Sequence, residues 1–146
     1  MEKHQFQIFI NAPREKVWEI LWGKDTYPQW TAPFSPGSNV FTDWKKGSKV
    51  IFGDGSGNGM IARIADTIPC EFMSFQHLGM VNDGVEDTES EKVKEWAGSH
   101  ENYTLKTVGG STEVTVDMDI SEEYAEMFKN IWPNALAVLK ELAEKG

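Results

Sequence analysis

The chain has little of the chemistry on which several protein classes depend. Its 146 residues include one cysteine, Cys70, and three histidines. A single cysteine cannot form an internal disulfide and excludes metal sites built from several thiolates. The histidines, His4, His77 and His100, are scattered and form no close ligand pair. The sequence therefore predicts no metal site, and it indicates no cofactor.

Long apolar runs are also lacking. The amino terminus, Met-Glu-Lys-His-Gln-Phe, has no apolar signal-peptide core, and no stretch approaches the roughly 18 apolar residues of a membrane span. Basic residues number 14 against 23 acidic ones, giving a formal net charge of −9. This charge disfavours nucleic acid and anionic membrane surfaces as partners. We expect a cytoplasmic protein without a membrane span.

The sequence is rich in large aromatic rings. It is 40% hydrophobic and 25% charged, a globular balance, and it carries six tryptophans and eight phenylalanines. So many rings in a chain this short favour a pocket or groove. The length suits one domain with a substantial core, so residues 1–146 are expected to form a single domain.

The hydrophobic pattern predicts an α+β protein. Residues 5–11 alternate as a strand, Pro13 suits the first turn of a helix that Gly23 ends, and a second short helix is expected over 26–30. Short turns require antiparallel neighbours, because a parallel pair needs a crossover of a dozen or more residues. Six further strands are predicted at about residues 39–43, 48–53, 59–67, 71–78, 101–108 and 112–120.

The last predicted element is a long amphipathic helix from about Tyr124 to Lys145. Ser121 is a plausible N-cap. Pro133 lacks an amide donor, so a kink or short break is expected near residues 130–132. A curved sheet that grips one long helix usually leaves a cavity, and such cavities hold small apolar ligands.

Strand alternation indicates which side chains face this helix. Met73, Phe75 and His77 share one face, so a histidine lies level with expected core residues. A hydrogen-bonded core histidine and a catalytic one both fit this position. Tyr103 faces inward by the same alternation. No catalytic residue is assigned, and the candidates for lining a ligand cavity are Trp18, Trp30, Phe75, His77, Tyr103, Met118, Phe128 and Trp132.

Two segments between the strands need separate interpretation. The glycine-rich residues 53–59 lack the Lys-Ser/Thr of a phosphate loop and lead into a strand, so they are expected to form a flexible hairpin loop. The connection 79–100 is long and acidic. It is either a lid or binding loop or mobile surface, and Trp96 within it should pack over another part of the protein.

The order of these motifs resembles a known family. Residues 10–21 (Ile-Asn-Ala-Pro-Arg-Glu-Lys-Val-Trp-Glu-Ile-Leu), Tyr27-Pro-Gln-Trp30, Asp43-Trp-Lys-Lys-Gly47 and Met73-Ser-Phe-Gln-His77 are similar to the C-terminal domain of the activator of the Hsp90 ATPase. That family belongs to the START-like, Bet v 1-like superfamily. The resemblance implies a helix-grip fold: a seven-stranded antiparallel sheet around a long C-terminal helix, two short helices after the first strand, and a hydrophobic cavity between sheet and helix.

Three functions remain open at this point. The leading hypothesis is binding of a small hydrophobic or amphipathic ligand in that cavity. An alternative is an enzyme of the cyclase or dehydratase type, with His77 as general acid or base and Tyr103 orienting the substrate. The third is a partner-binding module of co-chaperone type that uses the acidic 79–100 segment. A homodimer is kept as a further alternative.

Overall fold

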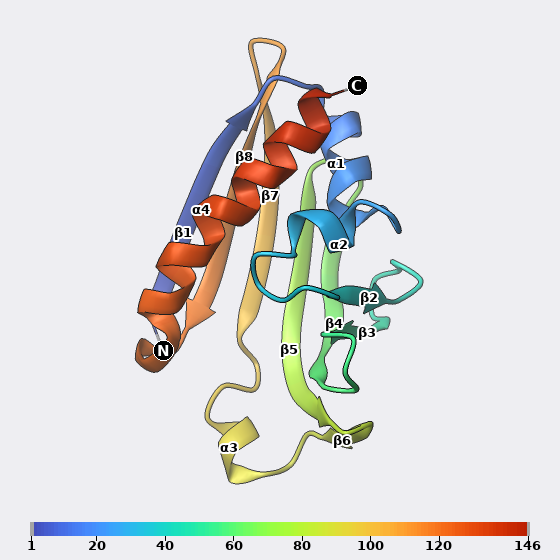
Figure 1. Cartoon of the computed structure of the whole chain (residues 1–146), viewed down its shortest axis with the longest axis vertical. Coiled ribbons are helices and arrows are strands. Elements are labelled where there is room, and N and C mark those ends of the chain that lie inside the picture. The colour runs from blue at the N-terminus through green and yellow to red at the C-terminus, as the bar shows by residue number, and fades with distance from the viewer. Residues whose placement is uncertain (1, 146) are drawn as a thin grey trace.

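The computed structural model describes residues 2–145 as one curved sheet with helices on its concave side (Figure 1). As predicted, the first strand, β1 (Glu2–Ile10), leads into two short helices, α1 (Arg14–Trp22) and α2 (Tyr27–Trp30). The following elements are β2 (Asn39–Phe41), β3 (Lys49–Gly53), β4 (Gly59–Ile68), β5 (Phe72–Asn82), β6 (Val85–Asp87), α3 (Glu91–Lys94), β7 (His100–Val108), β8 (Ser111–Ile120) and α4 (Glu122–Glu144).

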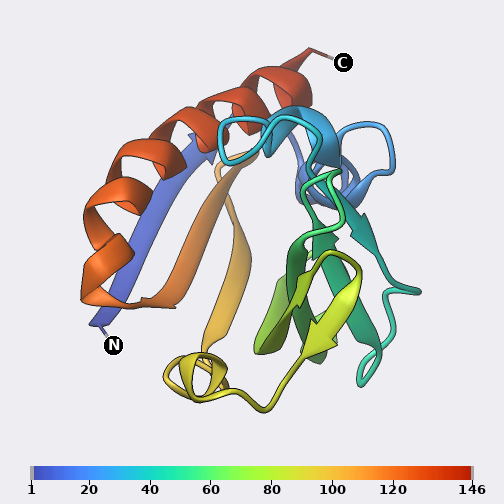
Figure 2. The same cartoon turned by 60° about the horizontal axis from the view of Figure 1, so that its bottom comes forward.

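The sheet has the predicted antiparallel topology. Its strands lie in the order β1-β8-β7-β5-β4-β3-β2, which includes all seven strands expected from the sequence. Each neighbouring pair is antiparallel, and β1 closes one edge by pairing along its whole length with β8. The arrangement is the helix-grip α+β fold, with α4 lying along β1 (Figure 2). No helix within residues 2–145 is long and apolar enough to cross a membrane.

The segment 79–100 is more ordered than a simple connection. Strand β5 continues to Asn82, and the chain turns back as β6 before the single turn of α3. Gly79 permits this return, because a Cβ there would lie 2.3 Å from the carbonyl oxygen of Asp87. Both added elements span only three or four residues, which is too short for hydrophobic periodicity to reveal them.

Helix α4 also corrects one expectation. Of the kink or short break expected near residues 130–132, the break is wrong, because α4 runs without interruption from Glu122 to Glu144 with Pro133 inside it, and the kink stays a prediction. Pro133 lies on the exposed side of the helix. The backbone group that it leaves unpaired therefore lies where water can hydrate it, so the helix can continue.

The concave face is built by the expected alternation. Val114 and Val116 of β8 are fully buried, as is Phe75 of β5. Register shifts between β4 and β5, at Ile61/Ala62 and Ile64/Asp66, mark bulges, which bend a strand and increase its twist. These irregularities lie in the middle of the sheet, where bending curls one half of it away from the other.

Contact between α4 and the rest of the protein differs along the helix. In its C-terminal half, Leu139 is fully buried and Leu136 is 3% exposed. In its N-terminal half, Tyr124 and Met127 are 42% and 47% exposed. The N-terminal half also buries Ala125 and Trp132, which are 8% and 2% exposed, so both halves contact the protein and the cover is less complete at the N-terminal end.

Substituting Leu139 should show which end of α4 anchors the fold. Leu139→Ala removes a fully buried side chain and is expected to lower the free energy of unfolding by about 2–5 kcal/mol. The comparison Met127→Ala, at a side chain 47% exposed in the N-terminal half of α4, should lose less than about 1 kcal/mol. Urea unfolding followed by circular dichroism measures both, and equal losses would contradict this assignment of the anchor.

Candidate functional site

Two adjoining pockets lie between the concave face of the sheet and the N-terminal half of α4. The first, the aromatic pocket, has a volume of about 280 Å³ and is walled by the rings of Tyr27, Trp30, Phe34, Phe52, Tyr103, Phe128 and Trp132. The second, the methionine pocket, has a volume of about 310 Å³ and is lined by Met60, Met80, Met118 and Met127, four of the six methionines in the sequence.

Four residues form a wall common to both pockets: Met60, His77, Met118 and Phe128. The pockets are therefore adjacent and share these four side chains. Each volume is near the lower end of the range for small-molecule sites, about 300–1,000 Å³. A ligand that extends past the common wall would have room in both.

Six of the eight candidates from the sequence meet in the aromatic pocket: Trp30, His77, Tyr103, Met118, Phe128 and Trp132. The other two lie elsewhere. Trp18 lines a separate groove beside Trp22 and Trp44. Phe75 is fully buried and packs edge-on against Phe52, with ring centroids 5.1 Å apart, so it supports the wall from behind.

Packing and hydrogen bonds hold the rings of the aromatic pocket in place. The indole N–H of Trp30 donates to the carbonyl oxygen of Leu21 at 2.9 Å, which fixes α2 against α1. Trp132 stacks on Phe6 with centroids 5.6 Å apart and meets Phe34 edge-on at 4.8 Å. The rings are therefore positioned by the protein before any ligand is present.

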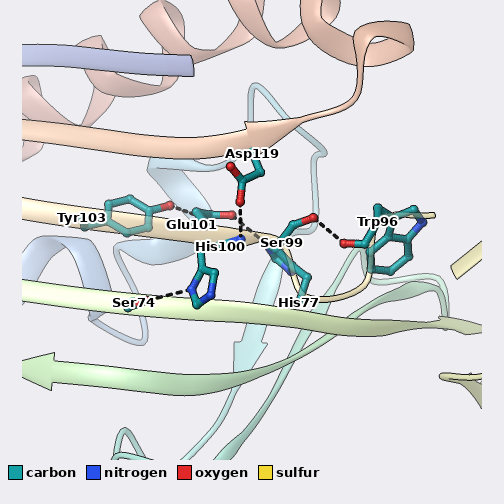
Figure 3. Close-up of polar contacts among 8 residues, drawn as sticks. All are labelled: Ser74, His77, Trp96, Ser99, His100, Glu101, Tyr103 and Asp119. Carbon is teal, nitrogen blue, oxygen red and sulfur yellow. Dashed lines mark hydrogen bonds and ion pairs between the residues drawn. The ribbon is translucent and has the colours of Figure 1, made fainter. Parts of the chain in front are cut away.

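A carboxylate, Glu101, lies among these rings (Figure 3). The Tyr103 hydroxyl donates a hydrogen bond to one of its oxygens, Oε2. The imidazole Nε2 of His77 lies 3.2 Å from the other oxygen, Oε1. The side chains of His77 and Glu101 are only 13% and 14% exposed. Since a carboxylate only accepts hydrogen bonds, Nε2 is the protonated nitrogen in this pair.

The two tyrosines of the aromatic pocket are held in their neutral form. Burial raises the pKa of Tyr103 well above its ordinary value, and the negative charge of Glu101 raises it further. Burial, and then the charge of Glu101, raise the pKa of Tyr27 in the same direction. Both phenols therefore keep their protons beyond the pH at which tyrosine ordinarily ionises, and Tyr103 donates its proton to Glu101 in a hydrogen bond.

Comparison with known proteins agrees with this architecture. The family described as Activator of Hsp90 ATPase homolog 1-like protein matches residues 11–144. The chain belongs to that family. No curated protein sequence matches it.

Solved structures with this fold include the Aha1 dimer from Colwellia psychrerythraea, 21% identical with a TM-score of 0.72, covering 99% of this chain and 97% of that one. Protein MLL2253 from Mesorhizobium loti is 13% identical with a TM-score of 0.75, covering 99% and 98%. CalU16 from Micromonospora echinospora is 15% identical with a TM-score of 0.67, covering 97% and 75%. At these identities the likeness establishes a common fold.

Sequence reasoning missed two polar residues of this family member's pocket, Glu101 and Tyr27. A signal for Glu101 was present, because the alternation that turns Tyr103 inward also turns inward the residue two positions before it. An acidic residue at an inward position looks like an exception to the alternation of apolar and polar residues until the partners of its carboxylate are known. Tyr27 lies in a helix of four residues, where no periodicity identifies the buried side.

The 79–100 segment contributes one wall of the methionine pocket. Trp96 is half-buried there, beside Lys92 and Ser99. The Ser99 hydroxyl donates to the backbone carbonyl oxygen of Trp96 (Figure 3). Trp96 therefore packs over this pocket, in agreement with the expectation that it contacts another part of the protein. Use of the acidic side chains of this segment by a protein partner remains a prediction.

The opposite face of the sheet carries a larger hollow of about 550 Å³. Its walls include Asp66, Asp117, Asp119 and His100, and they lack the ring of aromatic side chains found on the concave side. Ligand pockets are usually lined by apolar groups with a few polar ones to fix orientation. The aromatic and methionine pockets fit that description better.

The protein should lose less stability at alkaline pH when Tyr103 is replaced by phenylalanine. Above its ordinary pKa of 10.0, tyrosine in the unfolded chain ionises while buried Tyr103 keeps its proton. The unfolded state then binds fewer protons, so the free energy of unfolding falls by about 1.4 kcal/mol per pH unit for each such tyrosine. Tyr103→Phe should remove that share of the slope.

Urea unfolding of both proteins between about pH 9 and about pH 11 measures this difference. The hydrogen bond lost in Tyr103→Phe shifts the free energy by a similar amount at each pH, whereas the slope reports ionisation. Identical slopes would show that Tyr103 ionises normally in the folded protein.

Proposed function

We propose that this protein binds a small hydrophobic or amphipathic molecule in the joined aromatic and methionine pockets. The observation that carries the proposal is the position of α4. Its C-terminal half is buried, and its N-terminal half, with Tyr124 and Met127 about half exposed, forms one side of the methionine pocket. The helix thus covers this space without filling it.

The lining suits an apolar ligand. Burial of apolar surface contributes about 25 cal/mol per Å², and aromatic walls supply this without a large entropic cost because their rings are already fixed. Methionine side chains are flexible and polarisable, so the methionine pocket can adapt to ligands of different shape. The rigid aromatic pocket suits one ligand end of fixed shape, and the adaptable methionine pocket suits an apolar body that differs between ligands.

The geometry gives less support to an enzyme that uses His77 as its acid or base. Nε2 of His77 faces Glu101, and the other ring nitrogen, Nδ1, is covered by protein atoms. A general base must come within hydrogen-bond reach of the proton that it removes. In this arrangement the imidazole positions Glu101 rather than a substrate.

Homodimer formation remains a prediction, which light scattering would test.

A bulky side chain in the wall common to both pockets should weaken binding. The uncharged fluorescent probe N-phenyl-1-naphthylamine is expected to bind with increased fluorescence. Met118→Trp places a large ring in the wall common to both pockets and should weaken this binding by about tenfold or more, equivalent to about 1.4 kcal/mol.

The matched control is Val108→Trp, an exposed position at the end of β7 away from both pockets. It should bind the probe as the unmodified protein does. Circular dichroism confirms that both variants are folded. No fluorescence change with the unmodified protein, or equal weakening in both variants, would refute the proposal.

A further inference from the structure

The aromatic pocket contains a carboxylate that no fixed cation of the protein neutralises. Glu101 is 14% exposed, and its described polar partners are the Tyr103 hydroxyl and the His77 imidazole. Among residues 2–145, no lysine or arginine lines this pocket. A largely buried negative charge without a compensating positive charge is unfavourable, so the site favours a cation from outside the chain.

The surroundings of Glu101 are suited to a cation. Phe52 lies 6.1 Å from the ring of His77 and 6.5 Å from that of Tyr27, and Tyr103 is bonded to the carboxylate itself. The faces of aromatic rings carry partial negative charge and attract ammonium groups. The carboxylate and these rings line one pocket, so the electrostatic potential there favours a positive charge.

We propose that this pocket takes an amphipathic organic cation, whose ammonium group lies against Glu101 and whose apolar body extends into the methionine pocket. The inference rests on the proposed function and specifies its ligand class. A carboxylate offers about four acceptor positions, and the bonds to Tyr103 and His77 use two of them. The remaining positions can accept N–H donors from the ligand.

The reverse orientation is less favourable. An anionic ligand could place its head near Lys92, which lines the methionine pocket, but Asp119 lines the same pocket and opposes it. Its hydrocarbon body would then lie against Glu101 and remove water from the carboxylate without replacing the lost hydrogen bonds. The net charge of −9 also favours approach of a cation over an anion.

Protonated His77 is the internal competitor for this role. A positively charged imidazole 3.2 Å from Glu101 would neutralise the carboxylate without a ligand. In that case an ammonium group would gain little from the site. The ligand class therefore depends on whether the His77 imidazole or a cation from the ligand neutralises Glu101. Ligands that differ only in the charge of the head group can distinguish the two cases.

The experiment compares three ligands that share one decyl chain and differ only in the head: decylammonium, decanol and decanoate. Each displaces N-phenyl-1-naphthylamine at neutral pH and below its aggregation concentration. Decylammonium should bind at least about tenfold more tightly than decanol, because hydrogen bonds to a charged group are stronger than neutral ones. Decanoate should bind more weakly than decanol.

Three variants identify the group responsible. Glu101→Gln keeps the shape of the side chain and removes its charge, so decylammonium and decanol should then differ by less than about threefold. The matched control, Glu126→Gln, makes the same change on the exposed side of α4 and should keep the full preference. His77→Gln removes the competing imidazole and should keep or increase the preference.

The outcomes separate the ligand class from the proposed function. If decanol and the fluorescent probe bind but decylammonium has no advantage, the cation proposal is wrong and the binding function stands. It is equally wrong if decanoate binds best, or if Glu101→Gln keeps the advantage. If none of the three ligands nor the probe binds, the binding function itself fails.

Discussion

The cavity of this protein follows from the unequal fit between one long helix and a curved sheet. Leu136 and Leu139 hold the C-terminal half of α4 against the core. The bulges between β4 and β5 bend the sheet, and the N-terminal half of α4 lines the pockets on its concave side. Cavity and fold therefore have the same physical origin, because the packing that buries one end of the helix leaves Tyr124 and Met127 partly exposed at the other.

The interior combines apolar support with one polar centre. Trp30, Phe75 and Trp132 are almost completely buried and build a fixed wall. Within that wall, Glu101 accepts hydrogen bonds from Tyr103 and His77. Low exposure strengthens these bonds and makes an uncompensated charge unfavourable at the same time. The burial that makes the pocket apolar is therefore also the basis of the proposed preference for a cationic ligand.

Much of the architecture could be predicted from the sequence, because period-two alternation and turn residues are local signals. They located all seven strands of the main sheet, the two short helices after β1 and the long α4. Prediction failed where local signals were weak or misleading. Strand β6 and helix α3 are too short to show a period, and Pro133 does not break α4 because it lies on the exposed side of the helix.

The candidate site was predictable in part for the same reason. Alternation identified the inward positions of His77, Tyr103 and Met118, and the structure brings all three to the aromatic pocket. Alternation cannot show how deep an inward side chain lies or what stands behind it. Glu101 was therefore passed over although its position follows the same rule, and Trp18, in helix α1, was chosen although it lines another groove.

By itself, the sequence determined the order of strands and helices, the face to which each strand residue points and the acidic charge of the molecule. These depend on neighbours within a few residues along the chain. Only the tertiary structure decided that α4 continues past Pro133, that the 79–100 segment becomes a cavity wall, and that Glu101 meets His77 and Tyr103. Each depends on side chains or backbone from different elements, whose distances are set when the sheet curves and the helix packs against it.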